Sequence, residues 1–273
     1  SIPKAPRGYK KLILKLPNQI LDLTQNRMNE LPSIHCNISQ TMGHFNVENF
    51  IEIFRFFILE AKIIFFSPKI YNLTNTILTF LTFISPFKYQ YQIVSVLPRN
   101  LYSFCEAISP FIFGINESYS KDFFKKHRIN IEDSTICLVD ADTGKYSLVA
   151  PDGILDEKEY PPLPKNIKEK LIHKLNKYIK ALIMGSTEGI KVKEDNKKYQ
   201  KIFHNIMLYI LRDYPKFLRQ DYGVTRTIGM NIQDMIDLPN YINSQNPSDR
   251  DFYTKIFDSQ MFIEFIYKRM MPK

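Results

Sequence analysis

Residues 54–68 read FRFFILEAKIIFFSP, and this stretch decides the fold class. Its first half belongs to a helical pattern that starts after Asn46, a residue type suited to capping a helix, and that has apolar side chains at helical spacing. Its second half, Lys62–Phe66, is an apolar run without alternation, and a Ser-Pro pair stops it. Such a run is typical of a central strand that is covered on both faces. We therefore expect a sheet with helices packed on it.

Strand-like and helix-like segments alternate outward from this stretch, up to about residue 160. We predict strands over residues 10–16, 62–66, 92–97, 135–140 and 145–150. We predict helices over residues 46–61, 73–84, 100–107 and 119–127. The run 92–97 (QIVSVL) is interpreted as a second buried strand, and the last two strands as a hairpin turned through Asp142-Thr143-Gly144. Strands separated by helices predict an α/β fold with a layered central sheet flanked by helices.

The character of the chain changes after Asp152, where an all-helical C-terminal part is expected. Prolines precede a clear amphipathic helix over residues 165–184, and polar residues follow it. Further helices are predicted over residues 196–214, 234–243, 247–257 and 260–270. The predicted division is an α/β domain over residues 1–185, a mobile linker over 186–195 and a helical part over 196–273.

The composition indicates a folded protein of the cytoplasm. The chain has 273 residues, of which 44% are apolar and 14% aromatic, so it can bury a large core and is not disordered. Three widely separated cysteines fit reduced thiols better than a disulfide framework. The most apolar stretches are interrupted by charges or are too short to cross a bilayer, so we expect a soluble protein.

The net charge of +9 has two interpretations. It can attract acidic partners such as nucleic acid or anionic lipid, or it can reflect the Lys-rich codon usage of an AT-rich genome. The lysines are spread along the chain without a contiguous basic tract, which favours the second interpretation. Five lysines of the 165–184 helix lie away from its apolar stripe, where they can meet a membrane surface or simply remain in water.

No catalytic signature is present in the sequence. There is no phosphate-binding GxxxxGK[ST] loop, no GxGxxG and no GxSxG. His35, Cys36 and His44 are close in sequence but fit no structural zinc spacing. Asp140 and Asp142 can serve acid–base chemistry, although side chains that form a turn explain them better. We therefore expect a binding or regulatory module, with no catalytic residue, no metal and no cofactor.

Several segments, taken in order, resemble the DENN domain family. ILEAKIIFFSPKIYNLTNTILTFLTFISPF (58–87) resembles the family's helix, strand and following helix that ends in Pro-Phe. An aromatic-Gln pair before an apolar strand (88–104) and the segment AISPFIFGI (107–115) follow in the family's order. STICLVDADTGK (134–145) resembles the family's valine-rich strand and Asp-x-Asp turn, and a Pro-Leu-Pro that leads into a helix follows it. IFDSQMFIEFI (256–266) resembles the last helix of the downstream part called dDENN. In relatives the aromatic of the pair is usually Trp, whereas this chain has Tyr89.

The resemblance implies a guanine-nucleotide exchange factor for Rab-type small GTPases in vesicle trafficking, which needs no covalent chemistry. It also implies a longin-like module upstream in the same polypeptide, which this sequence does not contain. The alternative is a non-catalytic adaptor or structural subunit that uses the DENN fold as a docking platform. Either protein would work in the cytoplasm, and recruitment to membrane surfaces stays open. Two further functions are less favoured. GTPase activation would need an arginine finger, and no Arg is singled out by the sequence. Nucleic-acid binding would need aromatic and basic residues interleaved on one element, and no element shows this.

The partner is expected at loops beside the ends of the buried strands, where open α/β sheets bind ligands. The predicted partner-binding residues are Pro86, Phe87, Tyr89, Gln90, Pro98, Arg99, Asn100, Ser109, Pro110 and Phe111. Phe87 and Phe111 can equally belong to the core, and the prolines can serve only to shape turns. Arg99 is the best candidate for an exposed anchor, since Arg is enriched at the centres of protein interfaces.

Overall fold

The structure is a computed structural model that describes residues 13–16, 19–22, 31, 35–131, 135–150, 159–184, 191–219 and 235–270. The chain forms two compact units, Ser1–His35 and Cys36–Lys273. In the first unit, β1 (Ile13–Leu16) and β2 (Gln19–Asp22) pair as an antiparallel hairpin. The strand predicted over 10–16 is therefore confirmed for its last four residues, and residues 10–12 lie outside the described part.

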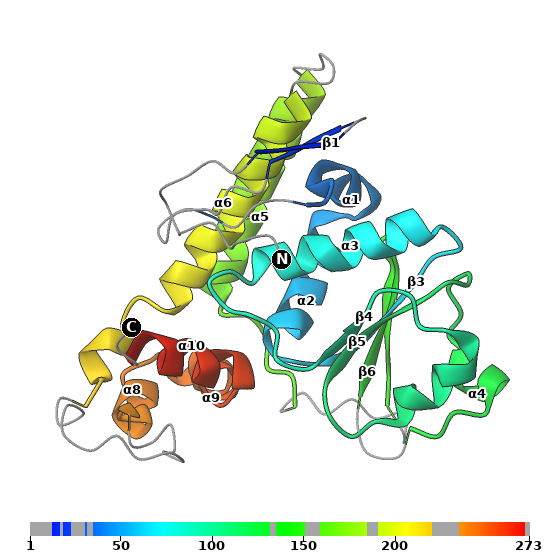
Figure 1. Cartoon of the computed structure of the whole chain (residues 1–273). Coiled ribbons are helices and arrows are strands. Elements are labelled where there is room, and N and C mark those ends of the chain that lie inside the picture. Colours follow the sequence, from blue (N-terminus) through cyan, green and yellow to red (C-terminus); the bar gives the residue numbers. More distant parts are fainter. Residues whose placement is uncertain are drawn as a thin grey trace. The chain divides into compact units, whose positions relative to one another are not determined.

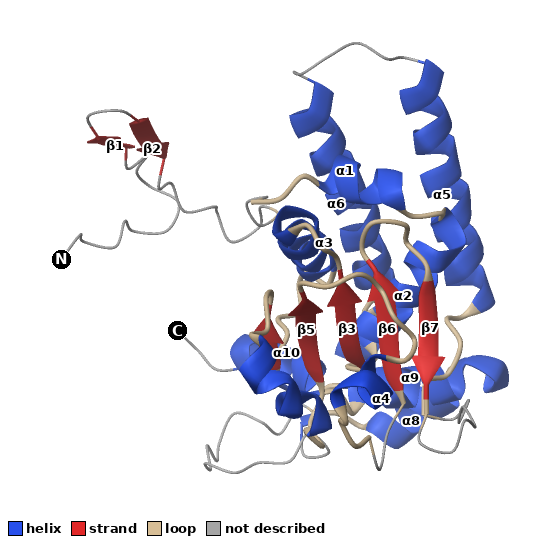
Figure 2. Ribbon diagram, turned by 90° about the vertical axis from the view of Figure 1, so that its right-hand side faces the viewer, coloured by secondary structure: helices blue, strands red, loops and turns tan. Residues whose placement is uncertain are grey.

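The second unit is built on a mixed five-stranded sheet in the order β4-β5-β3-β6-β7 (Figure 2). The strands are β3 (Lys62–Phe66), β4 (Gln92–Val94), β5 (Phe111–Ile115), β6 (Ile136–Asp140) and β7 (Tyr146–Val149). The pairs β4–β5, β5–β3 and β3–β6 are parallel, and β7 returns antiparallel to β6. The predicted α/β fold with a layered central sheet is confirmed, as are the central strand at 62–66 and the hairpin at 135–150.

The central strand β3 is buried along its whole length because helices cover both faces of the sheet. On one face lie α2 (Val47–Ile58), which Asn46 caps as predicted, and α3 (Ile70–Phe83). On the other lie the 3₁₀ helix η1 (Arg99–Glu106) and α4 (Phe123–His127). The side chains of β3 alternate between the two layers: Phe65 meets Phe80 of α3, and Phe66 meets Phe123 of α4. A fifth helix, α1 (Ile38–His44), packs beside α3.

The run 92–97 is not the buried strand that its apolar pattern predicts. Only Gln92–Val94 form β4, which lies at the end of the sheet, with Gln92 and Ile93 exposed. The buried position beside β3 belongs instead to β5, which the sequence pattern did not identify as a strand. An edge strand has one neighbour, so its apolar side chains are covered less completely. The helices predicted over 100–107 and 119–127 are a 3₁₀ helix and the single short turn of α4.

The C-terminal part is helical, as predicted. It contains α5 (Lys165–Met184), α6 (Lys191–Ile210), η2 (Tyr214–Phe217), α8 (Leu238–Asn243), η4 (Pro247–Asp249), α9 (Arg250–Phe257) and α10 (Gln260–Met270). The helix α6 begins at Lys191, so the last five residues of the predicted linker are helical. Figure 1 shows α5 and α6 side by side as an antiparallel hairpin. Phe203 of α6 stacks on Phe83 of α3 at 4.0 Å between ring centroids, which joins the hairpin to the helices of the sheet.

The last helix, α10, is fixed to the turn that leads into β3. The carboxylate of Glu60 accepts hydrogen bonds from the backbone N–H groups of Gln260 (3.0 Å) and Met261 (2.8 Å) at the start of α10. The φ angle of Glu60 is +55°, a left-handed conformation that a side chain other than glycine rarely adopts. Helix α10 also packs its rings against Phe87. The C-terminal helices therefore support the end of the sheet at which the parallel strands begin.

Gly114 of β5 lies so close to the segment after β4 that a side chain cannot fit. A Cβ atom there would lie 2.0 Å from the carbonyl oxygen of Ser95. We expect Gly114→Ala to lower the free energy of unfolding by about 1–3 kcal/mol, measured by urea denaturation, because the backbone must move apart. The matched control is Gly43→Ala in α1, where nothing lies within 4 Å of the added Cβ. That variant should gain about 0.5–1 kcal/mol from the helix preference of Ala, and equal effects of the two substitutions would contradict the close packing.

Candidate partner-binding surface

The four parallel strands end at one edge of the sheet, which we call the carboxyl edge (Figure 2). Hydrogen bonds join the chain segments that leave the strands there. The N–H of Ser67 donates to the carbonyl of Ile115 (3.2 Å), and the side-chain amide of Asn116 donates to the carbonyl of Ser67 (3.0 Å). The N–H of Ala141 donates to the carbonyl of Phe66 (2.9 Å). Open α/β sheets bind ligands beyond this edge, so a rigid carboxyl edge is a suitable binding platform.

Asp140 and Asp142 hold this edge together. The Asp142 carboxylate accepts hydrogen bonds from the Ser67 hydroxyl (3.0 Å) and from the side-chain amide of Asn72 in α3 (2.6 Å). Asp140 accepts from the backbone N–H of Asp142 (2.9 Å) and from the Thr143 hydroxyl (2.6 Å). Both carboxylates thus satisfy donors of the turn and of the neighbouring helix. This arrangement supports the turn-forming interpretation of the two residues over acid–base chemistry.

The most exposed apolar side chains of the carboxyl edge are Ile70 and Tyr71, in the first turn of α3. Their exposed fractions are 55% and 59%, although the rest of α3 is largely buried. Pro68 and Lys69 before them are exposed as well. An exposed aromatic side chain on a rigid helix start is a typical anchor for a protein partner, because it offers a large contact area at little entropic cost.

A charged cluster around Glu117 lies at the same edge, directly after β5. The Glu117 carboxylate pairs with Arg99 (3.2 Å), Lys126 (2.9 Å) and His127 (3.6 Å), and it accepts a hydrogen bond from the Tyr102 hydroxyl (3.2 Å). Burial raises the pKa of Glu117, but Lys126, Arg99 and His127 outweigh that effect, so the pKa lies below its usual value. The Arg99 side chain remains 79% exposed, so its guanidinium is oriented by Glu117 and still accessible to a partner.

The predicted partner-binding residues fall at opposite edges of the sheet. Strands β4 and β5 run parallel, with Gln92 opposite Phe111, so the segments that precede the two strands share one edge. Residues 86–90 and 109–110 therefore lie at this amino edge, and residues 98–100 lie at the carboxyl edge. The structure brings each group together but does not combine them into one surface.

Several residues of the amino-edge group are part of the interior. Phe111 is fully buried and stacks on Phe113 (4.3 Å), and Phe87 is 4% exposed, so the core interpretation applies to both rings. Tyr89 is half-buried, and its hydroxyl has no hydrogen-bond partner among the described residues. Burial raises the pKa of Tyr89 far above its usual value, and the nearby Glu60 adds to the shift. The remaining members are exposed or partly exposed, namely Pro86, Gln90, Ser109 and Pro110.

Sequence reasoning missed Ile70, Tyr71 and Glu117. The signal for the first two was available, since they follow the central strand by four and five residues and therefore lie near its carboxyl end. The exposure of Ile70 and Tyr71 could not be predicted, because a helix that is apolar along its length does not reveal which of its turns is exposed to solvent. Glu117 gives no pattern at all, since its partners come from two separate segments, η1 and α4.

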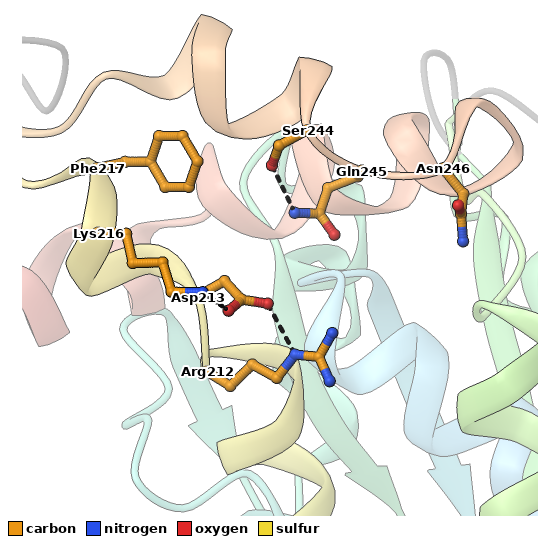
Figure 3. A pocket seen from close by; sticks show the side chains of 7 residues that line it. All are labelled: Arg212, Asp213, Lys216, Phe217, Ser244, Gln245 and Asn246. Atoms are coloured by element: carbon orange, nitrogen blue, oxygen red, sulfur yellow. Dashed lines mark hydrogen bonds and ion pairs between the residues drawn. The ribbon is translucent and has the colours of Figure 1, made fainter.

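A separate cavity lies in the C-terminal helical part (Figure 3). It has a volume of about 410 Å³ and is lined by Arg212, Asp213, Lys216, Phe217, Ser244, Gln245 and Asn246. Asp213 accepts hydrogen bonds from Arg212 (2.7 Å) and Lys216 (2.8 Å), and these two cations hold the pKa of its carboxyl below the usual range. Because Asp213 neutralises one of the two cations, the cavity offers only a weak attraction to an anion.

Within the parts of the chain that the structure describes, no three His, Cys, Asp or Glu side chains converge on a point that could hold a metal ion. His44 instead hydrogen-bonds the carbonyl of Ala141 (3.2 Å). In the same described parts, no helix is both long and apolar enough to cross a membrane.

The ion pairs of Glu117 predict a stability difference that depends on pH. Because the folded-state pKa of Glu117 is depressed, its contribution is present above the unfolded-state pKa and is lost as the pH falls through the folded-state pKa. We expect Glu117→Gln to cost about 1 kcal/mol at about pH 7, and we expect this cost to shrink progressively as the pH is lowered below the usual pKa of a glutamate, about 4.3, measured by urea denaturation. Asp122→Asn is the matched control, since the Asp122 carboxylate makes no hydrogen bond or ion pair within the described residues, and its effect should be small at both pH values. A cost for Glu117→Gln that persists at low pH would show that the ion pairs contribute nothing.

Comparisons with known proteins identify the family of the chain. The family model described as DENN (AEX-3) domain matches residues 1–144. DENN domain-containing protein 3 of Mus musculus is 20% identical over 283 aligned residues, which cover 98% of this chain and 21% of that protein. The chain thus spans about a fifth of the length of this relative. With a family match over about half of its length and the α/β fold in place, the chain belongs to the DENN (AEX-3) domain family.

Proposed function

We propose that this chain binds a Rab-type small GTPase and promotes exchange of its bound GDP for GTP, in the service of vesicle trafficking. The observation that supports this most is the carboxyl edge of the sheet. At this edge the chain, a member of the DENN family, presents the exposed side chains of Ile70 and Tyr71 next to polar turns. Arg99, which Glu117 orients, lies at the same edge. Such a combination of apolar anchor and accessible cation suits a protein partner better than a small molecule.

Exchange requires no covalent step on this chain. An exchange factor binds the nucleotide-free GTPase more tightly than the GDP-bound form, and by linkage it weakens nucleotide affinity by the same factor. The hydrogen bonds among Ser67, Asn72, Asn116 and Asp142 support this role, because they make the surface rigid. A rigid surface can hold the switch segments of the GTPase away from the conformation that closes over the nucleotide.

The proposal includes a longin-like module upstream in the same polypeptide and a protein that works in the cytoplasm. The division of the present chain into an α/β domain over 1–185, a linker and a helical part over 196–273 stays part of the same proposal. The adaptor alternative shares the docking surface but not the exchange activity, so one assay distinguishes the two.

The direct test is release of a fluorescent GDP analogue from a panel of purified Rab GTPases. We expect this chain, together with the polypeptide that precedes it, to accelerate release from at least one Rab by about tenfold or more. Binding of a Rab without acceleration would favour the docking platform, and neither binding nor acceleration across the panel would overturn both readings.

Substitutions at the two ends of the sheet test whether the partner binds at the carboxyl edge. We expect Tyr71→Ala and Arg99→Glu each to lower the catalytic efficiency of exchange by about tenfold, because interface anchors contribute more than about 1 kcal/mol. Gln90→Ala and Ser109→Ala, which lie at the amino edge, should leave it unchanged. The opposite pattern would place the GTPase at the amino edge. Thermal melts of all four variants check that the fold is intact.

A further inference from the structure

The positive charge of the chain is concentrated in the α5–α6 hairpin. Residues 165–210 contain eleven lysines and no arginine, against four carboxylates, so this segment holds seven of the nine net positive charges. The remaining residues of the chain, more than four fifths of its length, are nearly balanced. Although lysines are spread along the whole chain, most of the net positive charge therefore belongs to one structural element (Figure 1).

The two helices bury their apolar sides and leave lysines on their exposed sides. In α5, Ile167, Leu171 and Leu175 are fully buried, and in α6 the same holds for Phe203. Lys165 at the start of α5 is exposed and pairs with Glu169 (4.0 Å). The other exposed lysines of the described part of the hairpin are Lys170, Lys174, Lys177, Lys197, Lys198 and Lys201, which we call the lysine face.

Contacts between the helices show that the lysine face is continuous across the hairpin. The ammonium of Lys170 in α5 lies 3.8 Å from the ring centroid of Tyr209 in α6. In the other direction, the ammonium of Lys198 in α6 lies 5.4 Å from the ring centroid of Tyr178 in α5. Each helix thus extends a lysine over the other, so the exposed sides of the two helices adjoin.

Almost no carboxylate balances the lysine face. Among the described residues, only Lys198 has an acidic neighbour, Asp195 at 3.9 Å, and that carboxylate is itself buried. Several exposed cations outside the hairpin are paired: Arg99 and Lys126 with Glu117, Arg212 and Lys216 with Asp213. Like charges within a Debye length of about 8 Å repel one another, so an unbalanced group of this kind costs stability unless an anionic partner offsets it.

The chemistry of the face favours a lipid surface over nucleic acid. Lysine is a strongly hydrated point charge, whereas arginine is the preferred residue for directed contacts with phosphates and bases, and the hairpin has none. The rings of Tyr178 and Tyr209 each have a lysine over them, so these two rings are less available to stack on a base. Two adjoining helices offer a broad, diffuse positive surface, and Leu208 of α6 adds one exposed apolar side chain.

We propose that the α5–α6 hairpin binds anionic membranes, with lipid headgroups against the lysine face. The attraction is electrostatic and additive, on the order of 1 kcal/mol for each lysine near the surface, and it requires no insertion of the helices. This inference stands independently of nucleotide exchange, since it uses residues other than those of the carboxyl edge.

The test is binding of the chain to phosphatidylcholine vesicles with and without phosphatidylserine, measured by co-sedimentation. We expect binding only to the phosphatidylserine vesicles, and we expect high salt to abolish it. The variant K174E/K177E/K201E changes side chains that have no partner among the described residues, and it should bind at least about a hundredfold more weakly. The matched control K121E/K125E/K145E has the same charge change on exposed lysines of the sheet unit, and it should bind almost as well as the unsubstituted chain.

Circular dichroism of both triple variants establishes that they fold. Equal loss of binding in the two variants would mean that net charge rather than the lysine face is responsible, and that result overturns the proposal. So does binding to duplex DNA without binding to phosphatidylserine vesicles, which would assign the face to nucleic acid. Exchange activity measured in solution without vesicles should be the same for K174E/K177E/K201E as for the unsubstituted chain, so failure of this proposal and of the exchange proposal are distinguishable.

Discussion

The pairing of β3 with a parallel strand on each side is the constraint on which the rest of the structure depends. Both neighbours pair along Ile63–Phe66, with Phe65 opposite Gly114 on one side and Val139 on the other. The side chains of Ile63–Phe66 are apolar on both faces of this central strand, so both faces need a helical layer. That requirement positions α3 on one face and η1 on the other, and with them the exposed residues Tyr71 and Arg99 that begin these helices.

The sequence was sufficient wherever the signal is local. The buried strand 62–66, the Asn46 cap and the helices 165–184 and 260–270 follow from periodicity, stop residues and capping, and the structure confirms them. The order of the strands is not local. Nothing in QIVSVL reveals that it lies at the edge, since only the pairing of β5 with β3 leaves β4 outside. The predicted site was divided for the same reason, because residues before and after a parallel strand lie at opposite ends of the sheet.

Charge is distributed according to what surrounds it. At the sheet, each buried or half-buried carboxylate serves several donors: Glu117 orients Arg99, and Asp142 ties α3 to the end of the central strand. Such groups fix geometry and add little net charge. The helical hairpin does the reverse, since its lysines outnumber its carboxylates, and Lys170 and Lys198 lie over tyrosine rings of the opposite helix. A linear count of charges cannot separate these two situations, because it gives the same weight to a cation that is paired across the fold and to one that is not.

The contact between Glu60 and the first N–H groups of α10 has a practical meaning for fragments of this protein. A polypeptide that stopped before Gln260 would leave a largely buried carboxylate without its two donors and would uncover the ring of Phe87. The loss of such donors is costly, and the bared ring would promote aggregation. Helix α10 is therefore part of the unit that contains the sheet. A fragment that ended with the α/β region would lack side chains that pack in the interior of that unit.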